Sequence, residues 1–282
     1  MTDETPAAPA EKPLDEQVLH RVEQGVSWIT LNRPEAHNAL TPQQRDRMYE
    51  LIEGANGNFD VRALVLTGTG PAFCTGADLR VTREAPPRPA EAPERVMGEP
   101  RQMMLKGQIR LMSAIMDCEK PIICAVNGTA AGVGAHLAFC CDLVIAAESA
   151  RFIEVFVRRG LVPDGLGAYI LPRIVGLQKA KELIFFGDDV HAAQAKEIGL
   201  INKVVPDNEL ESAAREWAER LASGPTKSLM LSKWLLNRSL DVDRTTLAQE
   251  EAWAVELITT TLDMQEGVAS FVERRKPVWR GY

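Results

Sequence analysis

The feature that most constrains the fold of this chain is a unit repeated in its middle: an apolar run, a glycine-rich loop and a helix-like stretch. The run "ALVLTG" (63–68) is followed by "GPAFCTGADLR", and "KPIICAVNG" (120–128) is followed by "TAAGVGAHLAFCC". Short apolar runs that end in glycine are typical of buried strands. Strands that alternate with helices favour parallel pairing, so the sequence predicts an α/β fold.

The two ends of the chain differ from this middle part. Residues 1–16 are acidic and rich in proline and alanine, which predicts a disordered tail and no targeting segment. Residues 17–205 hold the predicted strands, and Thr41 with Pro42 is typical of a helix start. Residues 206–282 have a mostly helical pattern that could serve assembly. Residues 82–100 contain five prolines and are predicted to be a mobile loop.

Composition limits the class of protein. A net charge of −7 over 282 residues leaves no excess of basic residues for broad nucleic-acid binding. No apolar run reaches the roughly 18 residues that a membrane-spanning helix needs. The five cysteines include no CxxC pair, so we expect neither a disulfide framework nor a zinc site, and we expect the chain in a reducing cytoplasm.

Two of the glycine-rich loops, at 73–79 ("FCTGADL") and 132–134 ("GVG"), can present unpaired backbone N–H groups. Two such groups that converge on one point form an oxyanion hole. The alternative is a pair of tight turns without a ligand. A dinucleotide-binding interpretation of "VLTGTGPAFCTG" fails, because the third glycine is misplaced and Pro71 and Phe73 crowd the turn.

Five stretches, taken together and in order, resemble the crotonase (enoyl-CoA hydratase/isomerase) superfamily over about residues 18–280. They are "LNRPEAHNAL", "FCTGADL", "KPIICAVNGTAAGVGAHLAFCCDLVIA", "GLVPDGLGAYILPRIVG" and "EGVASFVERRKPVW". The resemblance implies a spiral of ββα units with a C-terminal helical region, which would serve trimerisation. It also implies an acyl-CoA thioester ligand, with coenzyme A as part of the substrate and no metal or redox cofactor. Homotrimers or homohexamers are implied as well.

The resemblance further implies where the thioester lies. The oxyanion N–H groups fall on Ala77 and Val133, and Val133 replaces the glycine of most relatives, which could narrow the pocket. Contacts with the substrate or its CoA part fall on Arg33, Ala36, His37, Ala39, Gly76, Asp78, Leu79 and Phe156. Phe271 and Arg274 would reach the nucleotide end from a neighbouring subunit. The basic cluster at 274–276 fits phosphate contact and fits a solvated helix end equally well.

The residues that would move protons depart from the hydratases of this superfamily, which use two glutamates to hold and activate water. The first of these positions is His136 and the second is Phe156. Glu154 lies two residues before Phe156, and we expect its side chain to point away from that position. The two-glutamate mechanism is therefore not carried over to this chain.

Asp164 and His136 are the candidate catalytic residues. Asp164, in "VPDGLG", falls where several isomerases of the superfamily place a catalytic aspartate, and the alternative is a helix N-cap. His136 lies in an apolar helix, where a lone histidine is usually a hydrogen-bonded core residue. It nevertheless holds a catalytic position, and an imidazole can titrate across neutral pH.

The sequence therefore predicts an acyl-CoA enzyme that stabilises a thioester enolate and transfers a proton along the acyl chain. Double-bond isomerisation with Asp164 and hydration with Asp164 and His136 are both open. The alternative is a protein that binds acyl-CoA without catalysis, which the loss of both glutamates motivates.

Overall fold

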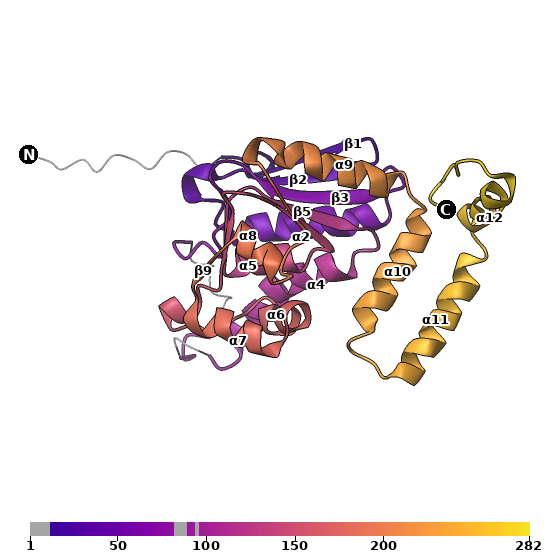
Figure 1. The fold of residues 1–282 in the computed structure, drawn as a ribbon. Helices are drawn as coiled ribbons and strands as arrows, with labels where there is room; N and C mark the ends of the chain where they lie inside the picture. Colours follow the sequence, from indigo (N-terminus) through magenta and orange to yellow (C-terminus); the bar gives the residue numbers. More distant parts are fainter. Residues whose placement is uncertain (1–11, 82–88, 94–95) are drawn as a thin grey trace, which may run out of the picture.

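The computed structural model describes residues 12–81, 89–93 and 96–282, and its strands form two sheets (Figure 1). The larger sheet has the spatial order β1 (Val18–Glu23), β2 (Val26–Leu31), β3 (Ala63–Gly68), β5 (Ile122–Val126), β7 (Leu143–Ala147) and β10 (Lys203–Val205). The smaller sheet has the order β4 (Ala72–Cys74), β6 (Thr129–Ala131), β8 (Arg151–Ile153) and β9 (Asp189–His191).

The α-helices surround these sheets. They are α1 (Leu14–Gln17), α2 (Pro42–Asn56), α3 (Glu99–Met104), α4 (Arg110–Asp117), α5 (Val133–Phe139), α6 (Gly167–Val175), α7 (Leu177–Phe186), α8 (Ala192–Glu197), α9 (Leu210–Ala222), α10 (Thr226–Arg238), α11 (Arg244–Ile258) and α12 (Leu262–Glu273). Short 3-10 turns are η1 (Pro34–Ala36), η3 (Val157–Arg159) and η4 (Asp207–Glu209), and a π-helical turn, η2 (Leu105–Ile109), joins α3 to α4.

The chain repeats a unit of two strands and a helix, which confirms the predicted crotonase-like α/β spiral. Strands β3, β5 and β7 of the larger sheet are each followed by a short strand of the smaller sheet, namely β4, β6 and β8. Neighbours β2, β3, β5, β7 and β10 pair in parallel, and only the hairpin partner β1 is antiparallel in this sheet as described. The predicted strands at 18–22, 26–31 and 63–68 lie where they were expected.

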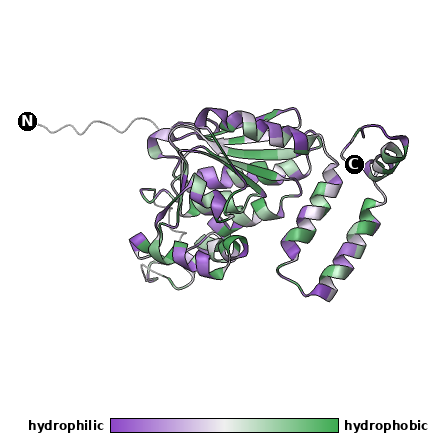
Figure 2. Ribbon diagram, in the orientation of Figure 1, coloured by the Kyte–Doolittle hydropathy of each residue, from purple (hydrophilic) through white to green (hydrophobic). Residues whose placement is uncertain are grey.

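The inner strands of the larger sheet are almost wholly buried because helices cover this sheet. Every residue of β2 and of β5 is buried. Helix α9 contacts β2, β3, β5 and β7, while α2 contacts β1 and β2. In Figure 1 α9 crosses the larger sheet, and in Figure 2 the strands beneath it are strongly hydrophobic. This layering explains why these strands read as continuous apolar runs rather than alternating ones.

Residues 1–11 of the predicted tail lie outside the described residues, and the short helix α1 begins at Leu14, within the stretch that was predicted to be a tail. The main-chain oxygen of Gln17 accepts from Asn32 N at 2.8 Å, which fixes this turn to the end of β2. The region predicted to be helical from residue 206 opens with η4 and α9, and Ala213, Ala214 and Ala218 of α9 pack in the core.

Helices α10, α11 and α12 extend away from the two sheets (Figure 1). Lys233 of α10 donates to Asp142 Oδ2 at 2.9 Å and to the Ile115 main-chain oxygen at 3.1 Å, which anchors α10 to the core. Arg62 donates to Gly224 O and to Thr226 Oγ1, and so fixes the start of α10. The separate C-terminal region is therefore residues 224–282.

The predicted mobile loop at 82–100 is only partly described, because residues 82–88 and 94–95 lie outside the described residues. The helix predicted at 102–117 begins three residues earlier, at Glu99 of α3, and continues through the π-helical turn into α4. Across the ranges that are described, no helix is long and apolar enough to cross a membrane.

The loop that precedes α2 is held by one asparagine. Asn38 is fully buried, and its backbone lies in the left-handed region with φ at 54°. Its Oδ1 accepts from Arg33 N at 2.8 Å, and its Nδ2 donates to Thr69 O at 2.9 Å and to Ala72 O at 2.8 Å. Asparagine tolerates this backbone conformation better than most residues. Asn38 therefore ties the loop 33–39 to the end of β3 and the start of β4.

We predict that Asn38→Ala lowers the free energy of unfolding by about 2–4 kcal/mol, because three hydrogen bonds between a fully buried side chain and the backbone are lost. Urea denaturation measures this loss. Gln24→Ala is the matched control, since Gln24 also has a positive φ, at 50°, but is exposed. It should cost about 0.5 kcal/mol or less. Equal losses in the two variants would show that backbone strain, and not the buried hydrogen bonds, governs position 38.

Candidate active site

Two loops meet at the end of β4. Leu40 N donates to Gly76 O at 2.8 Å and Asp78 N donates to Leu40 O at 2.9 Å, so Leu40 and Ala77 form a parallel bridge. In this parallel bridge Leu40 bonds to Gly76 and Asp78, the two residues that flank Ala77, and the N–H of Ala77 itself is directed away from Leu40.

The turn before α5 lies against this loop. A Cβ built on Gly76, whose φ is +100°, would lie 3.8 Å from the amide nitrogen of Val133. Val133 is the first residue of α5, so its N–H has no acceptor within the helix. Within the described part of the chain, neither the Ala77 N–H nor the Val133 N–H donates to a protein acceptor. The structure thus brings both predicted oxyanion residues to adjacent turns with unpaired donors.

Glycine permits the close approach of these two turns. A Cβ at Gly134 would lie 2.0 Å from the main-chain oxygen of Cys74, which no side chain could tolerate. Gly132 has φ +53°, and a Cβ there would lie 3.1 Å from Val155 Cγ1 and 3.5 Å from the Phe156 ring. The glycine pattern of the sequence therefore reflects both a left-handed turn and direct packing of α5 on β4.

His136 lies one helical turn after Val133 and is fully buried. Its Nδ1 lies 2.8 Å from the main-chain oxygen of Asp164, and its Nε2 lies 3.0 Å from both carboxylate oxygens of Glu154. The Phe156 ring stacks on the imidazole with 5.2 Å between ring centroids. His136 therefore lies in the core with both ring nitrogens hydrogen-bonded.

The expectation that Glu154 points away was wrong. Residues two apart in an extended segment lie on the same side, and β8 ends at Ile153, so the chain turns directly after it. As a result Glu154 and Phe156 both contact the His136 ring. Glu154 is a site residue that the sequence analysis set aside.

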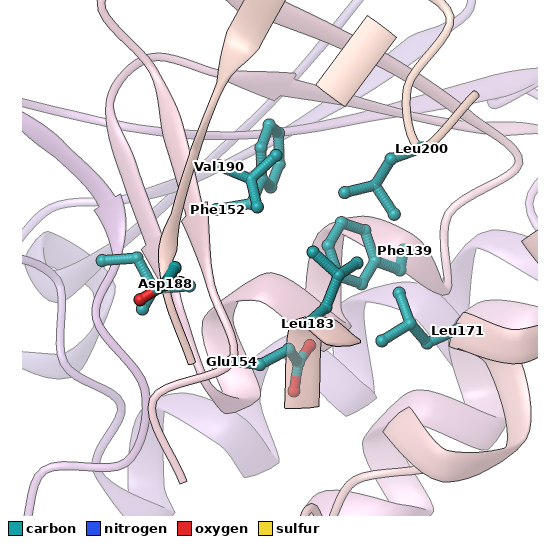
Figure 3. A pocket seen from close by; sticks show the side chains of 9 residues that line it. Phe139, Phe152, Glu154, Leu171, Leu183, Asp188, Val190 and Leu200 are labelled. Atoms are coloured by element: carbon teal, nitrogen blue, oxygen red, sulfur yellow. The ribbon is translucent and has the colours of Figure 1, made fainter. Parts of the chain in front are cut away.

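The carboxylate of Glu154 faces apolar side chains on its other sides. It lines a small cavity whose walls include Phe139, Phe152, Leu171 and Leu183, and Figure 3 shows these side chains around it. Glu154 is 5% exposed, and in the described ranges its carboxylate hydrogen-bonds only to His136. Asp188 lines the same cavity, but among the described residues it does not hydrogen-bond to the Glu154 carboxylate.

Asp164 lies at the opposite side of the His136 ring from Glu154. Its main-chain oxygen accepts from His136 Nδ1 and from Gly167 N, but its Oδ1 is buried and has no hydrogen-bond partner among the residues that the structure describes. Burial raises the pKa of its carboxyl group; the nearby His136 opposes this rise and the Glu154 charge adds to it. Asp164 is not a helix N-cap, because that position is Leu166 and no side chain caps α6.

Gln108 is a second unpaired polar group at this site, and the sequence analysis missed it. It belongs to the π-helical turn η2, in which Gly107 has non-helical angles, and its Oε1 is buried without a partner. A Cβ on Gly165 would lie 3.8 Å from Gln108 Cβ and 3.7 Å from Met112 Cγ. Single π-helical turns often mark functional sites. The feature of the sequence that could have indicated this irregular turn is Gly107, a glycine inside a helical pattern.

The predicted CoA-contact residues lie on the two loops joined at the Leu40–Ala77 bridge. Arg33 Nη1 donates to Ala39 O at 3.0 Å and lies 3.3 Å from Asp78 Oδ2. Two hydrogen bonds from Arg80, with a weaker one from Arg33, lower the pKa of Asp78 to about 2. Asp78 therefore clamps the loops together as a carboxylate.

The remaining predicted contacts differ in exposure. On the two loops Ala36, Ala39 and Gly76 are buried, whereas His37 and Leu79 are exposed. Phe271 is 85% exposed on α12, and Arg274 directly follows that helix. Within one chain these two residues are not brought to the site, since α12 lies in the region that extends away from the sheets (Figure 1).

Comparisons with known proteins identify the family of this chain. Residues 21–282 match the family model described as enoyl-CoA hydratase/isomerase. The chain is 37% identical to the 1,2-epoxyphenylacetyl-CoA isomerase of Escherichia coli, over 94% of this chain and 99% of that protein. It is 35% identical to the short-chain-enoyl-CoA hydratase of Clostridium acetobutylicum, over 92% of this chain and 95% of that protein.

Solved structures extend the likeness to the fold. The enoyl-CoA hydratase of Bacillus anthracis superposes with a TM-score of 0.84 at 32% identity, covering 94% of this chain and all of that one. The enoyl-CoA hydratase of Mycobacterium smegmatis superposes with a TM-score of 0.84 at 30% identity, covering 95% of this chain and 99% of that one. This chain therefore belongs to the enoyl-CoA hydratase/isomerase family of the crotonase superfamily.

Proposed function

We propose that this protein is an enoyl-CoA isomerase that moves a carbon–carbon double bond by proton transfer through Asp164. The observation that carries the proposal is the contrast between two neighbouring side chains. Asp164 Oδ1 is buried and unpaired, whereas both nitrogens of His136 are hydrogen-bonded within the protein. A proton carrier must have an atom free to reach the substrate.

Hydration is less well supported than isomerisation. Addition of water needs groups that hold the water and deliver its protons to two different atoms. The two positions that serve this in the hydratases are a fully buried histidine and a phenylalanine here, and those two rings stack on each other. One free carboxylate suffices for isomerisation, because the same group removes a proton from one carbon and returns it to another.

The proposed reaction begins with a 3-enoyl-CoA. Asp164 removes a proton from C2, and the electron pair moves into the thioester carbonyl to give a dienolate. The N–H groups of Ala77 and Val133 stabilise its oxyanion, and each such donor contributes about 10²–10³ in rate. Asp164 then returns the proton to C4, which gives the 2-enoyl-CoA. No electrons are gained or lost, so we propose that no metal or redox cofactor takes part.

Several further features of the proposal concern binding and assembly. The Arg33–Ala39 and Gly76–Arg80 loops hold the CoA part, and the Val133 side chain and Phe156 ring limit the width of the acyl pocket. The exposed apolar side chains of α10–α12, including Trp253 and Phe271, support a homotrimer or homohexamer. In that assembly Phe271 and Arg274 reach the CoA of a neighbour. We place the protein in the cytoplasm, where its free, buried cysteines stay reduced.

We predict that the wild-type protein converts 3-enoyl-CoAs to 2-enoyl-CoAs and that Asp164→Asn loses about 10²–10⁴ in kcat, the usual contribution of an acid–base group. A panel of 3-enoyl- and 2-enoyl-CoAs, followed by chromatography of the products, measures this. Asp60→Asn, the same change at an exposed residue, should be without effect. Hydration of 2-enoyl-CoAs that survives Asp164→Asn would contradict the proposal. Tight acyl-CoA binding without turnover on any thioester would favour the binding protein instead.

Asp164→Asn should at the same time stabilise the fold at neutral pH. The pKa of Asp164 is higher in the folded protein than its ordinary value, so its ionised form destabilises the native state. The stability gain of the asparagine variant should be present above the raised pKa and should vanish as the pH falls to the ordinary aspartate pKa. Thermal unfolding of both proteins between neutral and acidic pH checks this. A gain that stays constant with pH would contradict it.

A further inference from the structure

The pair formed by His136 and Glu154 is the most enclosed polar group near the site. The two residues are 0% and 5% exposed, and neither has a protein partner other than each other and the Asp164 carbonyl among the described residues. Burying two ionisable side chains costs free energy unless they are paired. We therefore ask what His136 and Glu154 do for the site.

Counting protons defines the state of this pair. The Asp164 main-chain oxygen can only accept, so His136 Nδ1 must carry a hydrogen to bond it at 2.8 Å. Nε2 lies 3.0 Å from both oxygens of Glu154, so one further proton is shared between the ring and the carboxyl group. The pair is neutral as a whole, and its Nδ1–H is fixed toward Asp164.

The surroundings hold the imidazole in this orientation. Phe156 stacks on one face of the ring at an interplanar angle of 18°. A Cβ on Gly167 would lie 2.0 Å from Cε1 and 2.1 Å from Nε2, so the backbone of α6 contacts the ring directly. The ring cannot turn to present a nitrogen to a substrate without moving α6.

The backbone that His136 holds is itself unusual. Asp164 is followed by Gly165 at φ +52° and by Leu166 at φ +63°, two left-handed residues in a row before α6 begins. Such a turn needs fixed partners to persist. The hydrogen bond from His136 Nδ1–H to the Asp164 main-chain oxygen supplies such a fixed partner. It acts on the residue whose Oδ1 has no hydrogen-bond partner among the described residues.

We propose that Glu154 and His136 are positioning residues: Glu154 fixes the protonation and orientation of His136, and His136 holds the Asp164 main chain so that its carboxylate faces the acyl chain. The proposal rests on the proposed role of Asp164. It assigns Glu154 a function in the site and removes His136 from contact with the substrate.

Kinetics of Glu154→Gln test the first part. Because small misplacements of a reacting group cost about 10² in rate, kcat for isomerisation should fall by about that factor while KM for the enoyl-CoA is unchanged. Glu148→Gln, an identical change at an exposed residue after β7, should leave both constants unchanged. A Glu154→Gln variant with wild-type kcat would overturn the proposal.

A double-mutant cycle tests whether Glu154 acts through His136. Glu154→Gln introduced into His136→Gln should cause no further loss in kcat, since residues that act as a unit are not additive. Losses that multiply would overturn the proposal, because they would mean that Glu154 and His136 act independently.

A readout independent of turnover separates this proposal from the proposed function. In ¹⁵N-histidine-labelled protein, His136 is assigned by its disappearance in His136→Gln, among the four histidines of the chain. Its Nδ1 should carry a proton, as the hydrogen bond to the Asp164 main-chain oxygen requires, and its Nε2 shift should change in Glu154→Gln. An Nδ1 without a proton would overturn the positioning pair. A protonated Nδ1 in a protein that turns over no enoyl-CoA would overturn only the proposed isomerisation.

Discussion

The site depends on how closely the start of α5 approaches β4. A Cβ at Gly134 would lie 2.0 Å from the Cys74 carbonyl oxygen, so only glycine allows the contact. This approach places the Val133 N–H beside the Gly76–Ala77 turn and fixes the direction of α5. His136, one turn further along, is then directed at the chain between β8 and α6, where Glu154, Phe156 and Asp164 lie.

At the two positions that the resemblance aligns with the hydratase glutamates this chain has His136 and Phe156, and we propose that these residues change the polarity of the site. A lone histidine in this core would leave buried nitrogens unpaired, which is costly in a medium of low polarity. Glu154 and the Asp164 carbonyl satisfy both nitrogens, and the Phe156 ring covers the imidazole face. In the described part of the chain the Oδ1 atom of Asp164 is buried without a hydrogen-bond partner, and this favours chemistry that needs a single proton carrier.

Much of the fold could be predicted from the sequence because the central strands are buried on both sides and read as apolar runs. The start of α2 was predicted because Thr41 and Pro42 are local signals for a helix start. The structure adds a capping box there, in which Thr41 N donates to Gln44 Oε1. The strands β4, β6, β8 and β9 could not be predicted from periodicity, since three residues show no period. Helix α9 was expected as a helix, but its packing on the larger sheet was not predicted, because an alanine-rich face fits a buried surface of any kind.

Ala77, Val133 and Asp164 were named through the resemblance of five stretches to one superfamily, and their roles stay predictions. Glu154 was missed because its direction depends on the turn after Ile153, and Gln108 because its placement depends on a π-helical turn at Gly107. Both depend on where the chain leaves regular structure, which residue patterns do not encode.

The central claim is that one carboxylate, Asp164, carries a proton from one carbon of the acyl chain to another. The direct test uses a 3-enoyl-CoA with deuterium at C2 and locates the label in the 2-enoyl product by mass spectrometry and NMR. Transfer by a single buried carboxylate predicts that deuterium appears at C4. Product whose C4 hydrogen comes wholly from solvent would contradict the account.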